Sequence, residues 1–339
     1  MRRLLLTSLF LIINFSVINA QNNLADCPDV VTPRLIVGVE GRVLPGEANR
    51  MRNQPTTAGA NIGRIPAGAI FDVLAGPVCA DGFNWWQVDY DGRIGWTVEG
   101  DSDTYWLQPL ISTDLMQYEL DYGDLAEGID GMIFDANVLS SAPELSTPAF
   151  LYSILAGWES VSNTDASISI YPVAAYADLS DYTAETLAEL RDILDVQGLP
   201  EDISDRFFLP NIMTAQMFRA HIGFVDFENG RGLRYITQFA QDMSPVHNAG
   251  TRYVFLGLTD DGAFFISALL PISMDFLPES YESADFNIEP ENYLDYLYGV
   301  VSQINNAPPS AFTPNLAAID AMFESLNFSL NTDEEQNAD

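Results

Sequence analysis

The stretch from Gly41 to Leu110 constrains the fold most, because short strand-like segments alternate in it with glycine turns. These segments are rich in β-branched and aromatic residues, as strands usually are. The turn Asp91-Gly92, between Val88 and Trp96, is a strong hairpin signal, since a two-residue turn needs positive φ angles that Asp-Gly tolerates. Further turns are expected at Gly59-Ala60-Asn61 and Ala80-Asp81-Gly82. We therefore predict a small β unit that curls on itself.

Six motifs in this stretch resemble, in their order, the bacterial SH3-like domain, a small β-barrel of secreted and cell-envelope proteins. They are Gly41-Arg42-Val43, Arg50-Met51-Arg52-Asn53-Gln54-Pro55, Ile62-Gly63-Arg64-Ile65-Pro66-Ala67-Gly68, Phe71-Asp72-Val73-Leu74, the run from Trp86 to Trp96, and Tyr105-Trp106-Leu107. The resemblance implies an SH3-like β-barrel over residues 27–110 that binds a cell-wall component or a peptide. Arg50 departs from the pattern, which usually has asparagine there; Asn49 comes one residue earlier.

Aromatic residues crowd the second half of this predicted barrel and are its candidate ligand-binding residues. They are Trp85, Trp86, Tyr90, Trp96, Tyr105 and Trp106. Tryptophan and tyrosine offer a large, rigid contact area with a polar group, which suits recognition of peptides or glycans. Side chains alternate along a strand, so either Trp85 or Trp86 belongs to the core and its neighbour is exposed or lines a groove. The alternative is that the whole set is core.

Residues 1–20 have the pattern of a secretory signal peptide, with Arg2 and Arg3 before a largely apolar run that ends at Ala20. The run is shorter than the ~20 apolar residues that span a bilayer, so we expect no transmembrane anchor after cleavage. In an exported protein, an even cysteine count predicts a disulfide between Cys27 and Cys79. Two buried thiols are the alternative. The predicted location is extracellular or in the cell envelope.

The charge balance is strongly acidic, with 48 acidic residues against 14 basic ones, all of which are arginines. Residues 111–339 hold 37 of the acids and six arginines. Such a surface repels nucleic acid, which we therefore do not expect as a partner. The absence of lysine excludes Schiff-base chemistry and phosphate loops that need a lysine. The acidic surface is interpreted as a solvated one, with cation binding or a basic partner as alternatives.

Residues 113–330 are predicted to form an acidic α+β domain with an antiparallel sheet, followed by a disordered acidic tail at 331–339. A strand is expected at Ser167–Tyr171, and two hairpins at 217–241 and 252–270 around Asn229-Gly230 and Asp261-Gly262. Three helices are expected: one capped by Thr183, one starting at Pro290 with Leu294, Leu297, Val301 and Ile304 on one face, and one starting at Thr313-Pro314.

The first hairpin carries a candidate patch for an anion or a partner, formed by Arg219, His221, Arg234 and Arg252. With Asn229-Gly230 as a two-residue turn, His221 would lie opposite Gln238 and Val225 opposite Arg234. Arg219, His221 and Arg234 would then share one face of the hairpin. Ion pairing of these arginines with neighbouring acids is the alternative.

No residue is predicted to be catalytic. No cysteine follows Cys79, which excludes a cysteine nucleophile from the larger domain, and His221 and His247 lack the spacing of a zinc site. The acidic turns at Asp89–Gly92 and Asp260–Gly262 lack the full calcium-loop pattern. We expect no metal and no cofactor. The sequence predicts a secreted binding protein; the alternative is a carboxylate-dependent hydrolase of cell-wall glycan.

Overall fold

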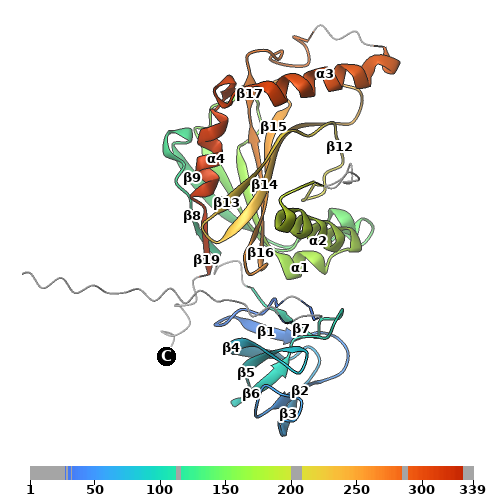
Figure 1. Cartoon of the computed structure of the whole chain (residues 1–339), viewed down its shortest axis with the longest axis vertical. Coiled ribbons are helices and arrows are strands. Elements are labelled where there is room, and N and C mark those ends of the chain that lie inside the picture. Colours follow the sequence, from blue (N-terminus) through green and yellow to red (C-terminus); the bar gives the residue numbers. More distant parts are fainter. Residues whose placement is uncertain are drawn as a thin grey trace, which may run out of the picture.

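The computed structural model contains two large antiparallel sheets that share no strand, one of seven and one of eight strands, with a few helices (Figure 1). The structure describes residues 27, 30–31, 33–111, 116–199, 208–284 and 289–330. The predicted signal peptide at 1–20 and the predicted tail at 331–339 lie outside these residues. The structure is mostly β with a few helices, and the antiparallel sheet expected in the larger part is present.

The smaller part is built on the seven-stranded sheet, whose strands follow the order β3-β2-β6-β5-β4-β1-β7. The strands are β1 (Glu40–Val43), β2 (Asn49–Arg52), β3 (Asn61–Ile65), β4 (Ile70–Ala80), β5 (Phe83–Tyr90), β6 (Arg93–Val98) and β7 (Leu107–Pro109). Two tight turns are confirmed. Tyr90 pairs with Arg93 around Asp91-Gly92, and Ala80 pairs with Phe83 around Asp81-Gly82. Both aspartates have a φ of 53°, as such turns require.

This sheet curls around one hydrophobic core but does not close. Ile65 of β3 and Leu107 of β7, from the two ends of the strand order, belong to the same buried cluster as Trp86. Within the described residues, however, β3 pairs only with β2 and β7 only with β1. The predicted closed barrel is therefore an open, curled sheet. The link between β2 and β6 is short and consists of Arg52 opposite Trp96.

The larger part is built on the eight-stranded sheet, in the order β12-β14-β15-β16-β11-β10-β9, with β13 also pairing with β14. Its strands are β9 (Gly128–Phe134), β10 (Phe150–Ala156), β11 (Ser167–Pro172), β12 (Ala215–Gln216), β13 (Ala220–Phe227), β14 (Gly230–Ala240), β15 (Thr251–Thr259) and β16 (Phe264–Pro271). The two predicted hairpins form its middle. Two small pairs flank the sheet: β8 (Met116–Glu119) with β19 (Asn327–Leu330), and β17 (Ser273–Met274) with β18 (Phe312–Thr313).

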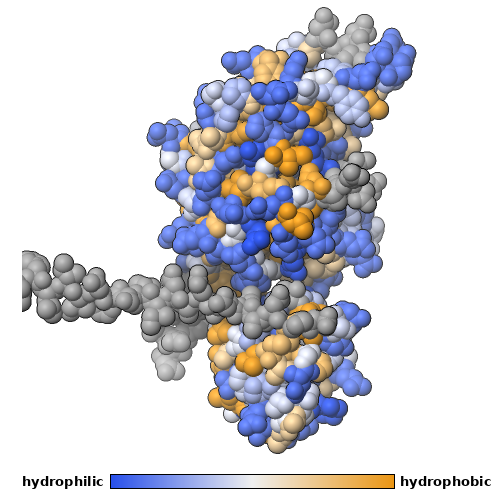
Figure 2. Space-filling view, viewed as in Figure 1, coloured by the Kyte–Doolittle hydropathy of each residue, from blue (hydrophilic) through white to orange (hydrophobic). Residues whose placement is uncertain are grey.

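Both faces of the central strands of the larger sheet are buried, because helices cover each face (Figure 1). The helices are α1 (Val173–Ala177), α2 (Asp181–Val196), α3 (Tyr293–Asn306) and α4 (Leu316–Glu324). On β15, Tyr253 and Phe255 pack in the cluster that includes α3 and α4, whereas Val254 and Leu256 pack in the cluster that includes α1 and α2. Alternate residues therefore enter two different cores. On the face that Figure 2 shows, the surface of this part is mostly hydrophilic, with apolar side chains gathered near β12 and β14.

The predicted helices are present, but their ends differ in detail. The cap of α2 is Ser180, whose side chain accepts the backbone N–H of Thr183 at 3.1 Å; Thr183 itself was the expected cap. On α3, Leu297 and Ile304 are buried as expected. Leu294 is 63% exposed, so its assignment to the buried face was wrong. Val300 is buried on this face of α3 together with Leu297 and Ile304.

The predicted register of the β13–β14 hairpin was wrong, because the turn lies one residue earlier in the chain than expected. The two turn residues are Glu228 and Asn229, so Phe227 pairs with Gly230 and Gly223 with Arg234. Gly230 is needed within β14, where a Cβ would clash with the carbonyl oxygen of Leu258. An irregularity in β13 then shifts the register again between Ala220 and Gly223.

Candidate functional site

The strongest candidate site is a cavity of about 560 Å³ in the smaller part. It lies against the outer side of β2, β3 and β5, beside the connection from β1 to β2. Its lining combines aromatic rings with arginines. The aromatic residues are Phe83, Trp85, Tyr105 and Trp106, and the arginines are Arg50, Arg52 and Arg64; the other lining residues are Leu44, Pro45, Gly46, Glu47, Ala48, Asn49, Thr57, Val98 and Thr104.

Three of the six predicted aromatic residues line this cavity, namely Trp85, Tyr105 and Trp106. Trp85 is 1% exposed, and its indole Nε1 donates to the carbonyl oxygen of Ala80 at 2.9 Å. The Phe83 ring, which sequence reasoning missed, lies 6.5 Å from the Trp85 ring and 6.4 Å from the Trp106 ring, measured between centroids. The cavity therefore has a firmly held aromatic wall.

The other three predicted aromatic residues do not line the cavity. Trp86 is buried in the core of the sheet, and Tyr90 packs against that core. Trp96 is half-buried on β6, opposite Gln87. Adjacent Trp85 and Trp86 thus point to opposite sides of β5, one to the cavity and one to the core, which is the arrangement that strand alternation predicts.

The arginines of the cavity were not predicted as site residues. Arg50 and Arg52 are two residues apart on β2, so their side chains share a face of the strand. Arg64 lies directly opposite Arg50 on β3. A signal was present in the sequence: residues 50–64 hold three of the six arginines found in residues 21–110.

A buried carboxyl group fixes the chain beside this cavity. Glu99 follows β6 and is fully buried; its Oε1 accepts the backbone N–H groups of Arg34 at 2.7 Å and Leu35 at 3.0 Å. Its Oε2 accepts the indole Nε1–H of Trp86 at 2.8 Å. Burial raises the pKa of Glu99 from 4.5 to about 7, against the opposing effect of these donors. The Arg34 guanidinium carbon lies 3.4 Å from the centroid of the Tyr105 ring, which connects this anchor to the cavity lining.

The predicted disulfide between Cys27 and Cys79 is confirmed, with the two Cα atoms 5.3 Å apart. It ties the segment that precedes β1 to the end of β4. The smaller part is therefore held by one covalent link and by the Glu99 anchor.

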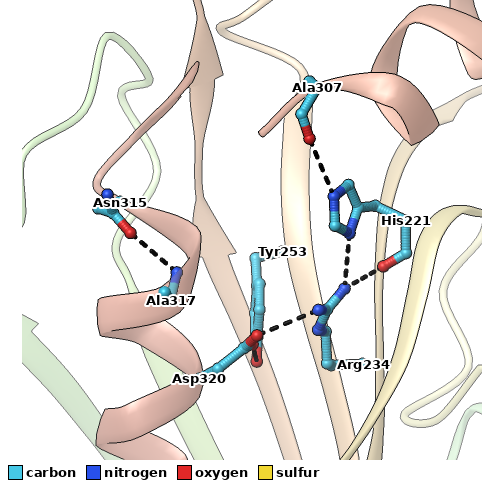
Figure 3. Close-up of polar contacts among 7 residues, drawn as sticks. All are labelled: His221, Arg234, Tyr253, Ala307, Asn315, Ala317 and Asp320. Carbon is cyan, nitrogen blue, oxygen red and sulfur yellow. Dashed lines mark hydrogen bonds and ion pairs between the residues drawn. The ribbon is translucent and has the colours of Figure 1, made fainter. Parts of the chain in front are cut away.

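The predicted arginine patch does not form as one surface. His221 and Arg234 come together on the face of the larger sheet that α4 covers (Figure 3). Arg234 Nη1 donates to His221 Nδ1 at 3.1 Å, and Arg234 Nη2 lies 3.1 Å from Asp320 Oδ2 of α4. Tyr253 Oη donates to Asp320 Oδ1 at 3.0 Å. Only 11% of the Arg234 side chain and 21% of the Asp320 side chain are exposed, so this is an internal network.

The donors in this network also define the tautomer of His221. Because Nδ1 accepts from Arg234, the proton is assigned to Nε2, which donates to the carbonyl oxygen of Ala307 at 3.2 Å. The contact links β13 to the segment that follows α3. The network thus connects the sheet to α4 and to the segment after α3. For Arg234, the alternative prediction of ion pairing with an acid is the one that the structure shows.

The remaining two residues of the predicted patch lie elsewhere. The Arg219 guanidinium carbon is 6.0 Å from the centroid of the Tyr235 ring, which belongs to the core on the other face of the sheet. Arg252 donates to Ser162 Oγ at 3.0 Å and to the carbonyl oxygens of Ala249 and Thr251. The four residues are therefore distributed over both faces of the sheet. The prediction assumed that one face of the hairpin is polar and exposed, whereas helices cover both faces.

Among the residues that the structure describes, no group of three or more His, Cys, Asp or Glu side chains could hold a metal ion. No helix in the same residues is long and apolar enough to cross a membrane.

Comparison of the sequence with models of known protein families and with curated proteins gave no match. The SH3-like resemblance therefore depends on the sequence motifs alone.

Proposed function

We propose that this chain is an exported binding protein whose N-terminal sheet is an SH3-like module that holds a cell-wall component or peptide in the cavity beside Trp106. The observation that carries the proposal is the cavity of about 560 Å³ lined by four aromatic residues and three arginines. Ligand sites typically have volumes of about 300–1,000 Å³ and apolar walls with a few well-placed polar groups. Export is supported by the signal-like residues 1–20 and by the disulfide, which forms in oxidising compartments.

The rigidity of the aromatic wall supports binding. Trp85 is held by a hydrogen bond and by burial, and the Phe83 ring packs against both Trp85 and Trp106. A wall that is already ordered loses little side-chain entropy when a ligand arrives. Tryptophan and tyrosine are also the side chains that most often dominate binding energies at interfaces. Trp106 is only partly buried, so it offers a ring face to a ligand.

The test is co-sedimentation of the full chain with purified cell-wall sacculi. The wild type should pellet with them, and Trp106→Ala should bind about tenfold or more weakly, as expected for a central aromatic contact. The matched control is Ile94→Ala, which shortens an apolar side chain that is 55% exposed on the same sheet and outside the cavity. It should bind like the wild type.

Two outcomes would contradict the proposal. One is full binding by Trp106→Ala, which would place the contact elsewhere. The other is release of soluble fragments from the sacculi by the wild type, which would indicate the glycan hydrolase. Thermal unfolding of each variant shows whether the sheet is intact.

A further inference from the structure

Two arginines of the cavity oppose each other directly across a strand pair. Arg50 of β2 and Arg64 of β3 are partners in the antiparallel register, and both are exposed. Side chains in such positions are close neighbours, and like charges directly opposite each other destabilise the pair. The fold therefore contains an unfavourable pair of like charges at Arg50 and Arg64.

Among the residues that the structure describes, no acidic side chain forms an ion pair with either arginine. In the described part of the chain, the ion pairs involve Arg231 and Arg234, and no carboxylate lies within ion-pair distance of Arg50 or Arg64. Glu47 is the only acidic residue among those that line the cavity.

A third arginine is partly fixed beside this pair. Arg52 Nη1 donates to the carbonyl oxygen of Gly59 at 2.7 Å. This bond uses one donor and leaves the rest of its guanidinium group for other partners, since arginine has five N–H donors in a planar fork. Arg52 shares the strand face of Arg50 and the same cavity. Three cationic side chains thus line one cavity, in which Glu47 is the only acidic side chain among the described lining residues.

We propose that Arg50, Arg64 and Arg52 bind a carboxylate of an acidic wall peptide, whose apolar portion lies on the ring of Trp106. The planar guanidinium group matches a carboxylate with two parallel hydrogen bonds. The bound anion removes the repulsion between Arg50 and Arg64. This inference rests on the proposed function, because it assigns the ligand chemistry of the same cavity.

The aromatic wall favours a peptide over a wall polymer of phosphates. A phosphate polymer would satisfy the arginines but would bring no apolar group to cover the four aromatic residues of the cavity. A peptide supplies both a carboxylate and apolar side chains within a short distance. Its carboxylates can also be converted to amides without changing its shape, which makes the inference testable.

The experiment uses sacculi stripped of phosphate polymers with hydrofluoric acid, either left untreated after stripping or with their carboxylates amidated by carbodiimide and ammonium chloride. Binding to unstripped sacculi is measured beside them. The wild type should bind untreated sacculi about tenfold or more tightly than amidated ones, since hydrogen bonds between charged groups are the strong ones. The double variant Arg50→Gln with Arg64→Gln should bind both preparations equally, at the weaker level. Arg93→Gln removes an exposed arginine of the same sheet outside the cavity and should keep the wild-type preference.

A second readout separates loss of binding from loss of fold. Without ligand, Arg50→Gln should unfold at the same temperature as the wild type or at a higher one, because it removes a like-charge pair. A lower unfolding temperature together with weaker binding would overturn the proposal in favour of a structural role for Arg50.

The remaining outcomes are also distinct. Equal wild-type binding to untreated and amidated sacculi, with Trp106→Ala still defective, would overturn the carboxylate inference and leave the proposed function standing. Binding that disappears when the phosphate polymers are removed would overturn it in favour of those polymers. Failure of the wild type to bind any preparation would overturn both proposals.

Discussion

The buried carboxyl group of Glu99 gives the smaller sheet a specific pH dependence. Its pKa is raised from 4.5 to about 7 by burial. At about 1.4 kcal/mol for each pKa unit, this difference amounts to about 3 kcal/mol. Because the folded state holds the proton more tightly, the stabilisation is complete below pH 4.5 and is lost as the pH rises through about 7.

The perturbation is Glu99→Gln, which removes the titration and keeps the size of the side chain. The amide of glutamine accepts hydrogen bonds only on its oxygen, so either the indole N–H of Trp86 or the backbone N–H groups of Arg34 and Leu35 lose their acceptor. A buried donor without a partner costs about 1–3 kcal/mol. The wild type should therefore be about 1–3 kcal/mol more stable than the variant near pH 4.5, and that difference should shrink by about 3 kcal/mol by pH 8.

The assay is urea unfolding followed by tryptophan fluorescence at a series of pH values. Trp85, Trp86, Trp96 and Trp106 belong to the smaller part, whereas Trp158 is the one tryptophan of the larger part. The signal therefore reports mainly on the sheet that contains Glu99.

The matched control is Glu47→Gln, which removes an exposed carboxyl group from the same part. The free energy of unfolding of Glu47→Gln, relative to that of the wild type, should not show the pH dependence expected for Glu99→Gln. A difference between the wild type and Glu99→Gln that stays constant from pH 4.5 to 8, or that grows, would refute the reasoning.

Three further predictions concern stability. Replacing Cys27 and Cys79 by serine should lower the free energy of unfolding of the smaller part by about 4 kcal/mol in urea titrations, because the bond closes a loop with a sequence separation of 52; an unchanged midpoint would contradict this. Asp320→Asn should cost about 3 kcal/mol, since it leaves the charge of Arg234 without its partner, as measured by far-ultraviolet circular dichroism in urea; an unchanged midpoint would count against this ion pair. Phe323→Ala should cost about 3–5 kcal/mol in the same assay, because this fully buried ring would leave a cavity; a loss below 1 kcal/mol would count against the packing described.

Local turn chemistry made much of the fold predictable. Asp91-Gly92 sits in a two-residue hairpin turn because its residues tolerate positive φ angles, and Gly262 in the second hairpin of the larger sheet also has a positive φ. Closure of the smaller sheet was not predictable from turns, since it depends on whether distant strands such as β3 and β7 meet. The register of the β13–β14 hairpin was also not predicted, because Gly230 lies in β14 and allows close packing against β15, and is not a turn residue.

The candidate site, like the fold, was predictable where it depends on local sequence and not where it depends on contacts between distant segments. Strand alternation correctly separates Trp85 from Trp86, because their side chains must point in opposite directions. The pairing of Arg50 with Arg64 was not predicted, because it depends on the register of two strands that a loop connects. The internal network around Arg234 was missed for another reason. Its partner Asp320 is distant in sequence and reaches the sheet only through the packing of α4.

The most direct test of the central claim is the location of the ligand, measured from the five tryptophan indole N–H signals in an NMR titration with soluble muropeptides released from sacculi. Our account predicts that the indole signals of Trp85 and Trp106 shift in a saturable way. The Trp158 signal, whose N–H donates to Pro271 in the larger part at 2.9 Å, should stay in place. A saturable shift of Trp158 with no change at Trp106 would contradict the account.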